Sequence, residues 1–312
     1  MNMEQLMAAT YAPLKADGSL NTGVVARYRE FLRANRVKGA FVNGSTGDFA
    51  SLSTEERKEL IDAWADGRPD GFTLVNHVGH TNLREARELA AHSNGRVDAV
   101  AALAPYYFRI RTLDSLLTYC REIAVCAPDT PFYYYHIPVL TGADFAMRDF
   151  LERAERDIPT FAGIKYSDGN LTDFGACVSY GDGDYRILFG VDEMLVDSLA
   201  AGATGWVGST YNHLAPLYQT LIRLYRKGET DAARQLQEKA VRFVQTLDGQ
   251  CGFNGAGKSF LREVGLDLGP SRFPHRSLTE EQRAAVMEVL EQLGILPHLS
   301  TVPAWPATTP AE

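Results

Sequence analysis

Short runs of β-branched, aromatic and small apolar residues recur along the chain. They are nearly continuous in apolar character rather than alternating, which is typical of parallel strands that are buried on both faces. Successive runs lie about 30 residues apart, which is the length of one strand–helix unit. The predicted strands are Leu6–Thr10, Gly39–Asn43, Thr73–Gly79, Ala99–Pro105, Pro131–Pro138, Phe161–Ser167, Arg186–Asp192 and Ala203–Thr210.

Amphipathic helical patterns separate these runs, for example Asn82–His92 and Leu113–Val125. The segment Ser53–Trp64 begins with Ser53 and carries Glu56 three residues later, the spacing of a capping box. Repeated strand–helix units favour a (β/α)8 TIM barrel over a doubly wound sheet, which usually has fewer strands. The apolar runs alone leave both architectures open.

After the last apolar run, the pattern of the chain predicts helices only. The patterns Leu214–Arg226, Thr230–Leu247, Lys258–Val264 and Thr279–Leu293 predict a helical extension that packs on the barrel. We therefore divide the chain into a barrel with the active site (1–222), a C-terminal helical extension (223–300) and a disordered tail rich in Pro, Ala and Thr (301–312).

Charge and composition exclude some classes of binding partner. The chain has 312 residues, 31 Lys and Arg against 39 Asp and Glu, and no basic block, which argues against nucleic acid and anionic membranes as partners. A small anionic substrate remains possible. The four cysteines form no CxxC pair, and the sequence has neither a basic leader nor a membrane-length apolar run. We expect reduced core cysteines in a cytoplasmic protein.

In a TIM barrel the active site is built at the carboxyl ends of the strands. Those ends are polar here. They carry Thr10, Gly44–Asp48, His77, Tyr106, Tyr107, Tyr135, His136, Lys165, Ser167, Asp192, Glu193 and Ser209.

Lys165 stands inside a run that otherwise reads as buried, Phe-Ala-Gly-Ile-Lys-Tyr-Ser. Burial disfavours the ammonium and lowers the pKa of a lysine, and a neutral amine can attack a ketone to form a Schiff base. The alternative is a lysine that extends from the strand end into solvent.

Two further features fit the same chemistry. Tyr135, at the end of the preceding strand, can reach the same cavity and move protons, although Tyr133 and Tyr134 show that core aromatics are common there. The turn Gly44–Gly47 offers backbone N–H groups and the hydroxyls of Ser45 and Thr46, which suit a carboxylate. A plain tight turn explains the same residues.

Asp192 and Glu193 form an adjacent acidic pair that can hydrogen-bond sugar hydroxyls or ligate a metal, and metal binding is the weaker of the two hypotheses. Adjacent strand residues point to opposite faces, so only one of the pair enters the barrel unless the strand has already ended. The histidines show no zinc-binding spacing and are interpreted as structural.

Gly252–Ser259 matches the P-loop pattern G-x-x-x-x-G-K-[ST]. A phosphate-binding P-loop needs a preceding strand and further strands for a magnesium ligand. A predicted helix precedes it here, so we interpret it as a glycine cap and a loop between two helices.

A series of motifs occurs in one order along the chain: Gly44-Ser-Thr-Gly47, His77-Val-Gly79, Pro105-Tyr-Tyr107, Tyr135-His-Ile-Pro138, Gly163-Ile-Lys165, Phe189-Gly-Val-Asp-Glu193 and Gly208-Ser-Thr-Tyr-Asn212. Together they resemble the N-acetylneuraminate lyase and dihydrodipicolinate synthase superfamily of pyruvate-dependent class I aldolases. The resemblance covers nearly the whole chain. It is greatest to the N-acetylneuraminate lyase branch, since Leu140 stands where the synthase branch usually has an arginine.

The resemblance implies a homotetrameric TIM-barrel lyase that splits N-acetylneuraminate reversibly into N-acetylmannosamine and pyruvate without metal or organic cofactor. Lys165 would form the Schiff base and Tyr135 would move the proton. Tyr107 would reach the site of a neighbouring subunit. The carboxylate would lie on Ser45 and Thr46, and the sugar chain on Ser167, Gly190, Asp192, Glu193 and Ser209.

The chain departs from the family pattern at two positions, and three alternative functions stay open. Asp48 stands where the family generally has glutamate, and Trp206 is bulkier than expected and could narrow the pocket. The alternatives are another pyruvate aldolase or hydratase acting on a different 2-keto sugar acid, dihydrodipicolinate synthase, and a pyruvate-binding barrel without catalysis.

Overall fold

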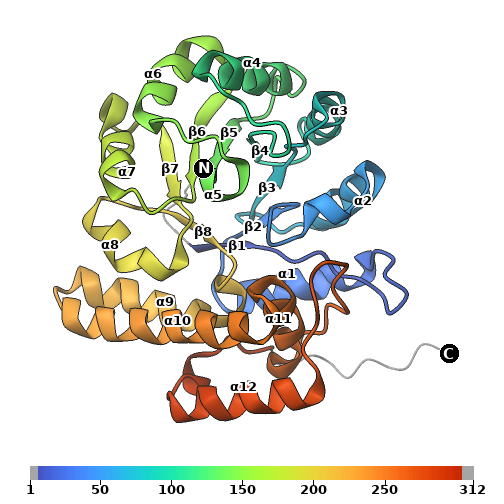
Figure 1. Cartoon of the computed structure of the whole chain (residues 1–312), viewed down its shortest axis with the longest axis vertical. Helices are drawn as coiled ribbons and strands as arrows, with labels where there is room; N and C mark the ends of the chain where they lie inside the picture. The colour runs from blue at the N-terminus through green and yellow to red at the C-terminus, as the bar shows by residue number, and fades with distance from the viewer. Residues whose placement is uncertain (1–5, 304–312) are drawn as a thin grey trace.

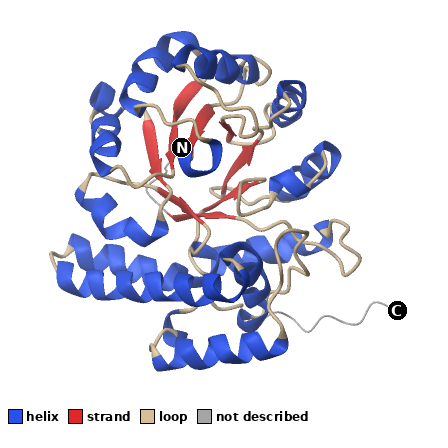
Figure 2. Cartoon of the chain, in the orientation of Figure 1, coloured by secondary structure: helices blue, strands red, loops and turns tan. Residues whose placement is uncertain are grey.

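The computed structural model describes residues 6–303, and its strands close into a parallel barrel (Figures 1 and 2). Strand order follows the chain, and the last strand pairs with the first. The predicted (β/α)8 barrel is confirmed, and each predicted run contains one strand. The strands are β1 (Leu6–Ala9), β2 (Gly39–Val42), β3 (Thr73–His77), β4 (Ala99–Leu103), β5 (Phe132–His136), β6 (Phe161–Tyr166), β7 (Arg186–Phe189) and β8 (Trp206–Gly208).

Helices surround the ring of strands (Figure 2). The helix after β2 begins at the predicted capping box, in which the Glu56 N–H donates to Ser53 Oγ over 3.1 Å and the Ser53 N–H donates to the Glu56 carboxylate over 2.9 Å. The helices of the barrel are α1 (Val25–Ala34), α2 (Thr54–Ala65), α3 (Leu83–Ser93), α4 (Leu113–Ala124), α5 (Pro138–Thr141), α6 (Met147–Asp157), α7 (Leu171–Val178), α8 (Leu195–Ala200) and α9 (Tyr211–Arg226).

Short 3-10 turns interrupt the connections. They are η1 (Thr22–Val24), η2 (Phe49–Ser51), η3 (Tyr180–Gly183), η4 (Asp192–Met194), η5 (Leu261–Val264) and η6 (Leu296–His298).

Alternate residues of each strand separate an inner core from an outer one. Tyr133 and Tyr135 of β5 belong to the cluster that fills the barrel, whereas Tyr134 between them packs toward the helices. Trp206 of β8 also faces outward, and its indole N–H donates to Ser198 Oγ of α8 over 2.9 Å. The expectation that Trp206 narrows the pocket is therefore wrong, because strand alternation places Val207 inside instead.

The C-terminal extension consists of α10 (Thr230–Cys251), α11 (Phe253–Phe260) and α12 (Glu280–Gln292). Helix α9 runs through residue 223, the predicted start of the extension, and α10 lies along it (Figure 1). Of the predicted tail, residues 304–312 lie outside the described residues. Thr301 exchanges two hydrogen bonds with the Asn35 side chain, of 2.8 and 2.9 Å.

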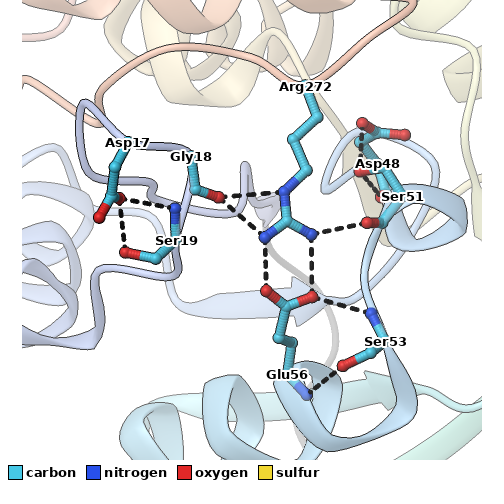
Figure 3. A network of polar contacts seen from close by, with 8 residues as sticks. All are labelled: Asp17, Gly18, Ser19, Asp48, Ser51, Ser53, Glu56 and Arg272. Atoms are coloured by element: carbon cyan, nitrogen blue, oxygen red, sulfur yellow. Dashed lines mark hydrogen bonds and ion pairs between the residues drawn. The ribbon is translucent and has the colours of Figure 1, made fainter.

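Arg272 fastens the segment between α11 and α12 to the barrel, as Figure 3 shows. Its guanidinium donates to the Gly18 carbonyl, to the Ser51 carbonyl over 2.6 Å, and to both carboxylate oxygens of Glu56. A planar guanidinium suits this two-pronged contact with a carboxylate. One side chain thus joins the loops after β1 and β2 to the extension.

The cysteines follow the expectation only in part. Cys120 and Cys177 are buried in the core, whereas Cys126 and Cys251 are half-buried, and all four thiols are free. Across residues 6–303, no helix is both long and apolar enough to cross a bilayer.

The P-loop-like segment is helical. Gly252 caps α10 with φ +87°, as predicted, but Phe253–Phe260 form α11, so the predicted loop is wrong over those residues. Its glycines serve packing, because a Cβ on Gly255 would lie 2.0 Å from the Arg276 carbonyl oxygen and one on Gly257 would lie 2.5 Å from the Tyr11 hydroxyl. With α10 directly before it, the segment lacks the strand that a P-loop needs.

Lys258, the lysine of that segment, is buried and donates to the Pro270 carbonyl oxygen over 2.5 Å. Burial lowers the pKa of Lys258 to about 7 from its ordinary value. The native state therefore binds fewer protons than the unfolded chain between pH 7 and the ordinary lysine pKa, and stability rises with pH in that window.

We expect the free energy of unfolding of the wild-type protein to rise relative to that of a Lys258→Met variant by about 3 kcal/mol between pH 7 and pH 10. Denaturant titrations across this range measure the difference. Lys227→Met, at the exposed end of α9, is the control and should differ from wild type equally at both pH values. A constant difference for Lys258→Met would contradict the prediction.

Candidate active site

Lys165 lies inside the barrel at the carboxyl end of β6, with a relative exposure of 4%. Its Nζ is 3.8 Å from the centroid of the Tyr135 ring and 4.3 Å from that of Phe41. Strand register causes the first contact, since Tyr135 of β5 pairs with Lys165. Two aromatic faces stabilise the ammonium and fix the position of the amine. The structure thus excludes a lysine that extends into solvent.

The Tyr135 phenol joins this lysine to the loop after β2. The phenol oxygen lies 3.4 Å from Ser45 Oγ, and either atom can donate. The ring is held edge-on by Phe41 at 5.5 Å and by His77 at 5.8 Å between centroids. Lys165, Tyr135 and Ser45 therefore lie together in the folded chain, although they come from three different strand ends.

His77 is a neutral support for the site. The Leu103 N–H donates to Nε2 over 3.3 Å, so the proton lies on Nδ1 and is donated to the Asn43 carbonyl oxygen over 2.7 Å. Burial lowers the pKa of His77 well below its ordinary value, and Arg57 adds to the effect. A neutral ring with both nitrogens bonded holds Tyr135 in place and moves no protons.

The loop that carries Ser45 and Thr46 is a closed turn. The Asp48 N–H donates to the Ser45 carbonyl oxygen over 3.0 Å, and the Asn254 side chain of α11 donates to the same oxygen over 3.0 Å. Asp48, in a left-handed conformation with φ +50°, accepts from the Ser51 hydroxyl over 2.6 Å. Asp48, whose side chain is one methylene shorter than the glutamate usual in the family, thus has a hydrogen-bond partner within its own turn.

A cavity of about 320 Å³ opens beside Ser45 at the mouth of the barrel. Leu140 and Thr141 of α5, which overlaps the ring of strands in Figure 1, form part of its wall. His275 from the extension also lines it, 3.8 Å from the Asp48 carboxylate. The remaining lining residues are Asp48, Phe49, Ala50, Leu103, Tyr106 and Asn254.

The acidic pair stands beyond the end of β7, in the turn η4, so strand alternation does not separate its members. Asp192 is buried, and its Oδ2 accepts from the Thr210 N–H over 2.9 Å and from the Thr210 hydroxyl over 2.6 Å. Its Oδ1 has no hydrogen-bond partner among the described residues. Burial raises the pKa of Asp192, and burial together with the Asp192 charge raises the pKa of Glu193.

Ser167, Gly190 and Ser209 occupy neighbouring strand ends. Within residues 6–303 the Ser167 hydroxyl is buried without a partner, and a Cβ on Gly190 would lie 2.1 Å from it. The Ser209 carbonyl oxygen accepts from the Asn212 side chain over 2.7 Å. Ser167 Oγ and Asp192 Oδ1 are thus two buried polar atoms at neighbouring strand ends that lack a hydrogen bond within residues 6–303.

Within one chain, the predicted site residue Tyr107 does not line the cavity at the barrel mouth. It is 79% exposed and stacks edge-on against Phe108, with 5.0 Å between the ring centroids. Sequence reasoning missed Asn254, Gln237 and His275, which belong to the extension. No local pattern marks them, because their partners are distant in the chain: Asn254 contacts Ser45, Gln237 donates to the Asp192 carbonyl oxygen over 3.1 Å, and His275 lies near Asp48.

Among the described residues, no group of three or more His, Cys, Asp or Glu side chains is arranged to hold a metal ion. The weaker hypothesis, a metal at Asp192 and Glu193, therefore has no further ligands of these types.

Comparison with known proteins gives one consistent result. A family model described as the dihydrodipicolinate synthetase family matches residues 2–293. The chain is 37% identical to the N-acetylneuraminate lyase of Rattus norvegicus over 94% of this chain and 93% of that protein, and 39% identical to that of Danio rerio over 86% and 89%. Among solved structures, the Proteus mirabilis N-acetylneuraminate lyase superposes with a TM-score of 0.90 at 34% identity, covering 95% of this chain and 100% of that chain.

Gly208 of β8 gives a test of the Asp192 geometry, because a Cβ there would lie 1.6 Å from Asp192 Oδ1. Gly208→Ala should lower the free energy of unfolding by roughly 1–3 kcal/mol, since the anchored carboxylate must shift. Gly249→Ala, in an exposed helical position of α10 with nothing within 4 Å, should raise it by about 0.5–1 kcal/mol. Equal changes in the free energy of unfolding for the two substitutions, measured by chemical denaturation, would contradict the predicted clash with Asp192.

Proposed function

Because the chain belongs to the dihydrodipicolinate synthetase family, we propose that it is a Schiff-base aldolase that cleaves N-acetylneuraminate reversibly to N-acetylmannosamine and pyruvate. The observation that carries the proposal is the buried Lys165 amine beside the Tyr135 phenol, which in turn meets the Ser45 loop. The names of the three similar proteins given above, each an N-acetylneuraminate lyase, support the substrate.

The first steps form the covalent intermediate. The substrate carboxylate binds to Ser45 and Thr46, which directs its C2 carbonyl toward Lys165. Once the Lys165 ammonium has lost a proton to water, the neutral amine attacks C2. The Tyr135 phenol protonates the departing hydroxyl of the carbinolamine, so that water leaves and an iminium ion remains. The positive nitrogen then attracts the electrons of the neighbouring C3–C4 bond.

Cleavage requires a proton to leave the C4 hydroxyl. The Tyr135 phenolate accepts this proton through a relay that includes the Ser45 hydroxyl, while the C3–C4 electron pair moves into the enamine. N-acetylmannosamine leaves with the new aldehyde. The Tyr135 phenol then protonates the enamine at C3. Hydrolysis of the resulting iminium ion releases pyruvate and restores both the Lys165 amine and the Tyr135 phenol. Since the iminium is the electron sink, the proposal requires no metal ion or organic cofactor.

The hydroxylated chain of the substrate extends toward the ends of β6, β7 and β8. Ser167, Gly190, Asp192, Glu193 and Ser209 are proposed to hold it. The unpartnered Ser167 Oγ and Asp192 Oδ1 support this role, because buried polar atoms are normally hydrogen-bonded and sugar hydroxyls can supply the missing bonds.

An exposed apolar surface supports assembly. Tyr107, Phe108, Val139 and Leu140 are all largely exposed around the mouth of the barrel. Clustered apolar side chains on a surface mark protein contacts. We propose that the chain forms a homotetramer in the cytoplasm, in which Tyr107 completes the site of a neighbouring subunit.

Other pyruvate-dependent reactions are the nearest alternatives. A different 2-keto sugar acid would use the same lysine and tyrosine. The synthase reaction is disfavoured, because Leu140 lines the mouth where a cation would hold a second carboxylate. A non-catalytic pyruvate-binding barrel leaves the Lys165 and Tyr135 arrangement unexplained.

Borohydride reduction during incubation with N-acetylneuraminate should add a pyruvate-sized mass to Lys165, located by peptide mapping. Lys165→Ala should show no adduct and no turnover. An adduct from added pyruvate but never from N-acetylneuraminate would retain the family chemistry and reject this substrate. No adduct from either compound would reject the Schiff-base mechanism.

Tyr135→Phe should slow cleavage by roughly 100-fold or more, because it removes the group that moves the C4 proton. The measurement is steady-state release of pyruvate from N-acetylneuraminate. Tyr133→Phe, the other inward-facing tyrosine of β5, is the matched control and should retain most of the rate. An unchanged rate for Tyr135→Phe would contradict the proposed role.

A further inference from the structure

Two amide side chains of the C-terminal extension reach the two ends of the candidate site. Asn254 of α11 contacts the loop after β2, and Gln237 of α10 contacts the turn after β7. Each contact joins backbone groups of a site loop to a helix that lies outside the strand–helix repeat. Neither amide bears a charge.

Asn254 fixes the peptide group that faces the keto-acid end. Its Nδ2 donates to the Ser45 carbonyl oxygen over 3.0 Å, and the Asp48 N–H donates to the same oxygen over 3.0 Å. The Ser45 carbonyl and the Thr46 N–H belong to one planar peptide unit and point in opposite directions. Holding the carbonyl therefore sets the direction of the Thr46 N–H.

Gln237 contacts both the turn η4 and the first turn of α8, which follows it directly. Its Nε2 donates to the Asp192 carbonyl oxygen over 3.1 Å, and its Oε1 accepts from the Val196 N–H over 3.2 Å. A carbonyl only accepts and an N–H only donates, so these partners settle the orientation of the amide. The backbone at Asp192 and Glu193 is thereby tied to α10.

We propose that Asn254 and Gln237 are positioning residues with separate tasks in one site. Asn254 sets the geometry that binds the carboxylate of pyruvate and of the sugar acid, and Gln237 sets the geometry that binds the hydroxylated chain. The inference rests on the proposed function, because it assigns the two loops to the two ends of that substrate.

The geometry separates the two effects. The Ser45 loop follows β2 and the η4 turn follows β7, and no hydrogen bond between the two loops exists within the described part of the chain. Pyruvate occupies only the keto-acid end, whereas N-acetylmannosamine supplies only the hydroxylated chain. The two compounds thus probe the two amides independently.

Asn254→Ala should raise the pyruvate concentration for half-maximal borohydride trapping on Lys165 by roughly tenfold, the effect of losing one neutral hydrogen bond. Gln237→Ala should leave that concentration within about twofold of wild type. Asn254→Ala removes a bond to the Ser45 carbonyl oxygen and Gln237→Ala removes a bond to the Asp192 carbonyl oxygen, so each variant weakens the support of a different loop.

Gln237→Ala should raise the KM for N-acetylmannosamine in the synthesis direction, at saturating pyruvate, by roughly tenfold. Asn254→Ala should leave this KM nearly unchanged, because saturating pyruvate compensates for its weaker binding. Gln235→Ala, exposed on α10 two residues from Gln237, is the control and should match wild type in both assays.

Equal shifts of both curves in both variants, or no shift in either, would overturn the proposal. If an alanine variant fails to fold, Asn254→Ser, whose hydroxyl ends short of the Ser45 carbonyl, and Gln237→Met, which keeps the side-chain volume, give the same test. Failure of the wild-type protein to trap pyruvate on Lys165 would instead reject the proposed function, so the two failures are distinguishable.

Discussion

The burial of one amine inside the barrel is the constraint on which the rest of this structure depends. Lys165 is almost inaccessible to water, and a charged amine is costly in such a place without compensation. The Tyr135 and Phe41 rings supply that compensation with their faces, and the β5–β6 register sets one of them opposite the lysine. His77, neutral and bonded at both nitrogens, packs edge-on against Tyr135 and fixes its position.

The C-terminal extension is part of the site. Arg272 ties the segment between α11 and α12 to the loops after β1 and β2. Asn254 and Gln237 then hold two backbone turns whose own strands have already ended. Loops at strand ends have few ladder hydrogen bonds, so their geometry comes from whatever packs over them. The glycines of α11 permit that close packing.

Much of the fold follows from local patterns. Apolar runs at regular spacing predicted the strands, and Ser53 with Glu56 predicted the start of α2, because strand burial and helix capping depend on neighbours in sequence. The prediction of a loop at the P-loop-like segment was wrong for the opposite reason. Its glycines are set by distant partners, Arg276 and Tyr11, which no local pattern contains. Trp206 was misplaced because one residue of register decides which face a strand side chain takes.

The sequence by itself determined the order of strands and helices and the family motifs, which single out Lys165 and Tyr135 as the proposed chemical pair, since strand period and motif order carry that information. Only the tertiary structure decided which atoms meet. Three contacts join segments that only the folded chain brings together. They are Asn254 with Ser45, Gln237 with Asp192, and Thr210 with the Asp192 carboxylate. Such contacts arise when the closed barrel and its extension fix the loops in space, and hydrogen bonds require that geometry to within a few tenths of an ångström.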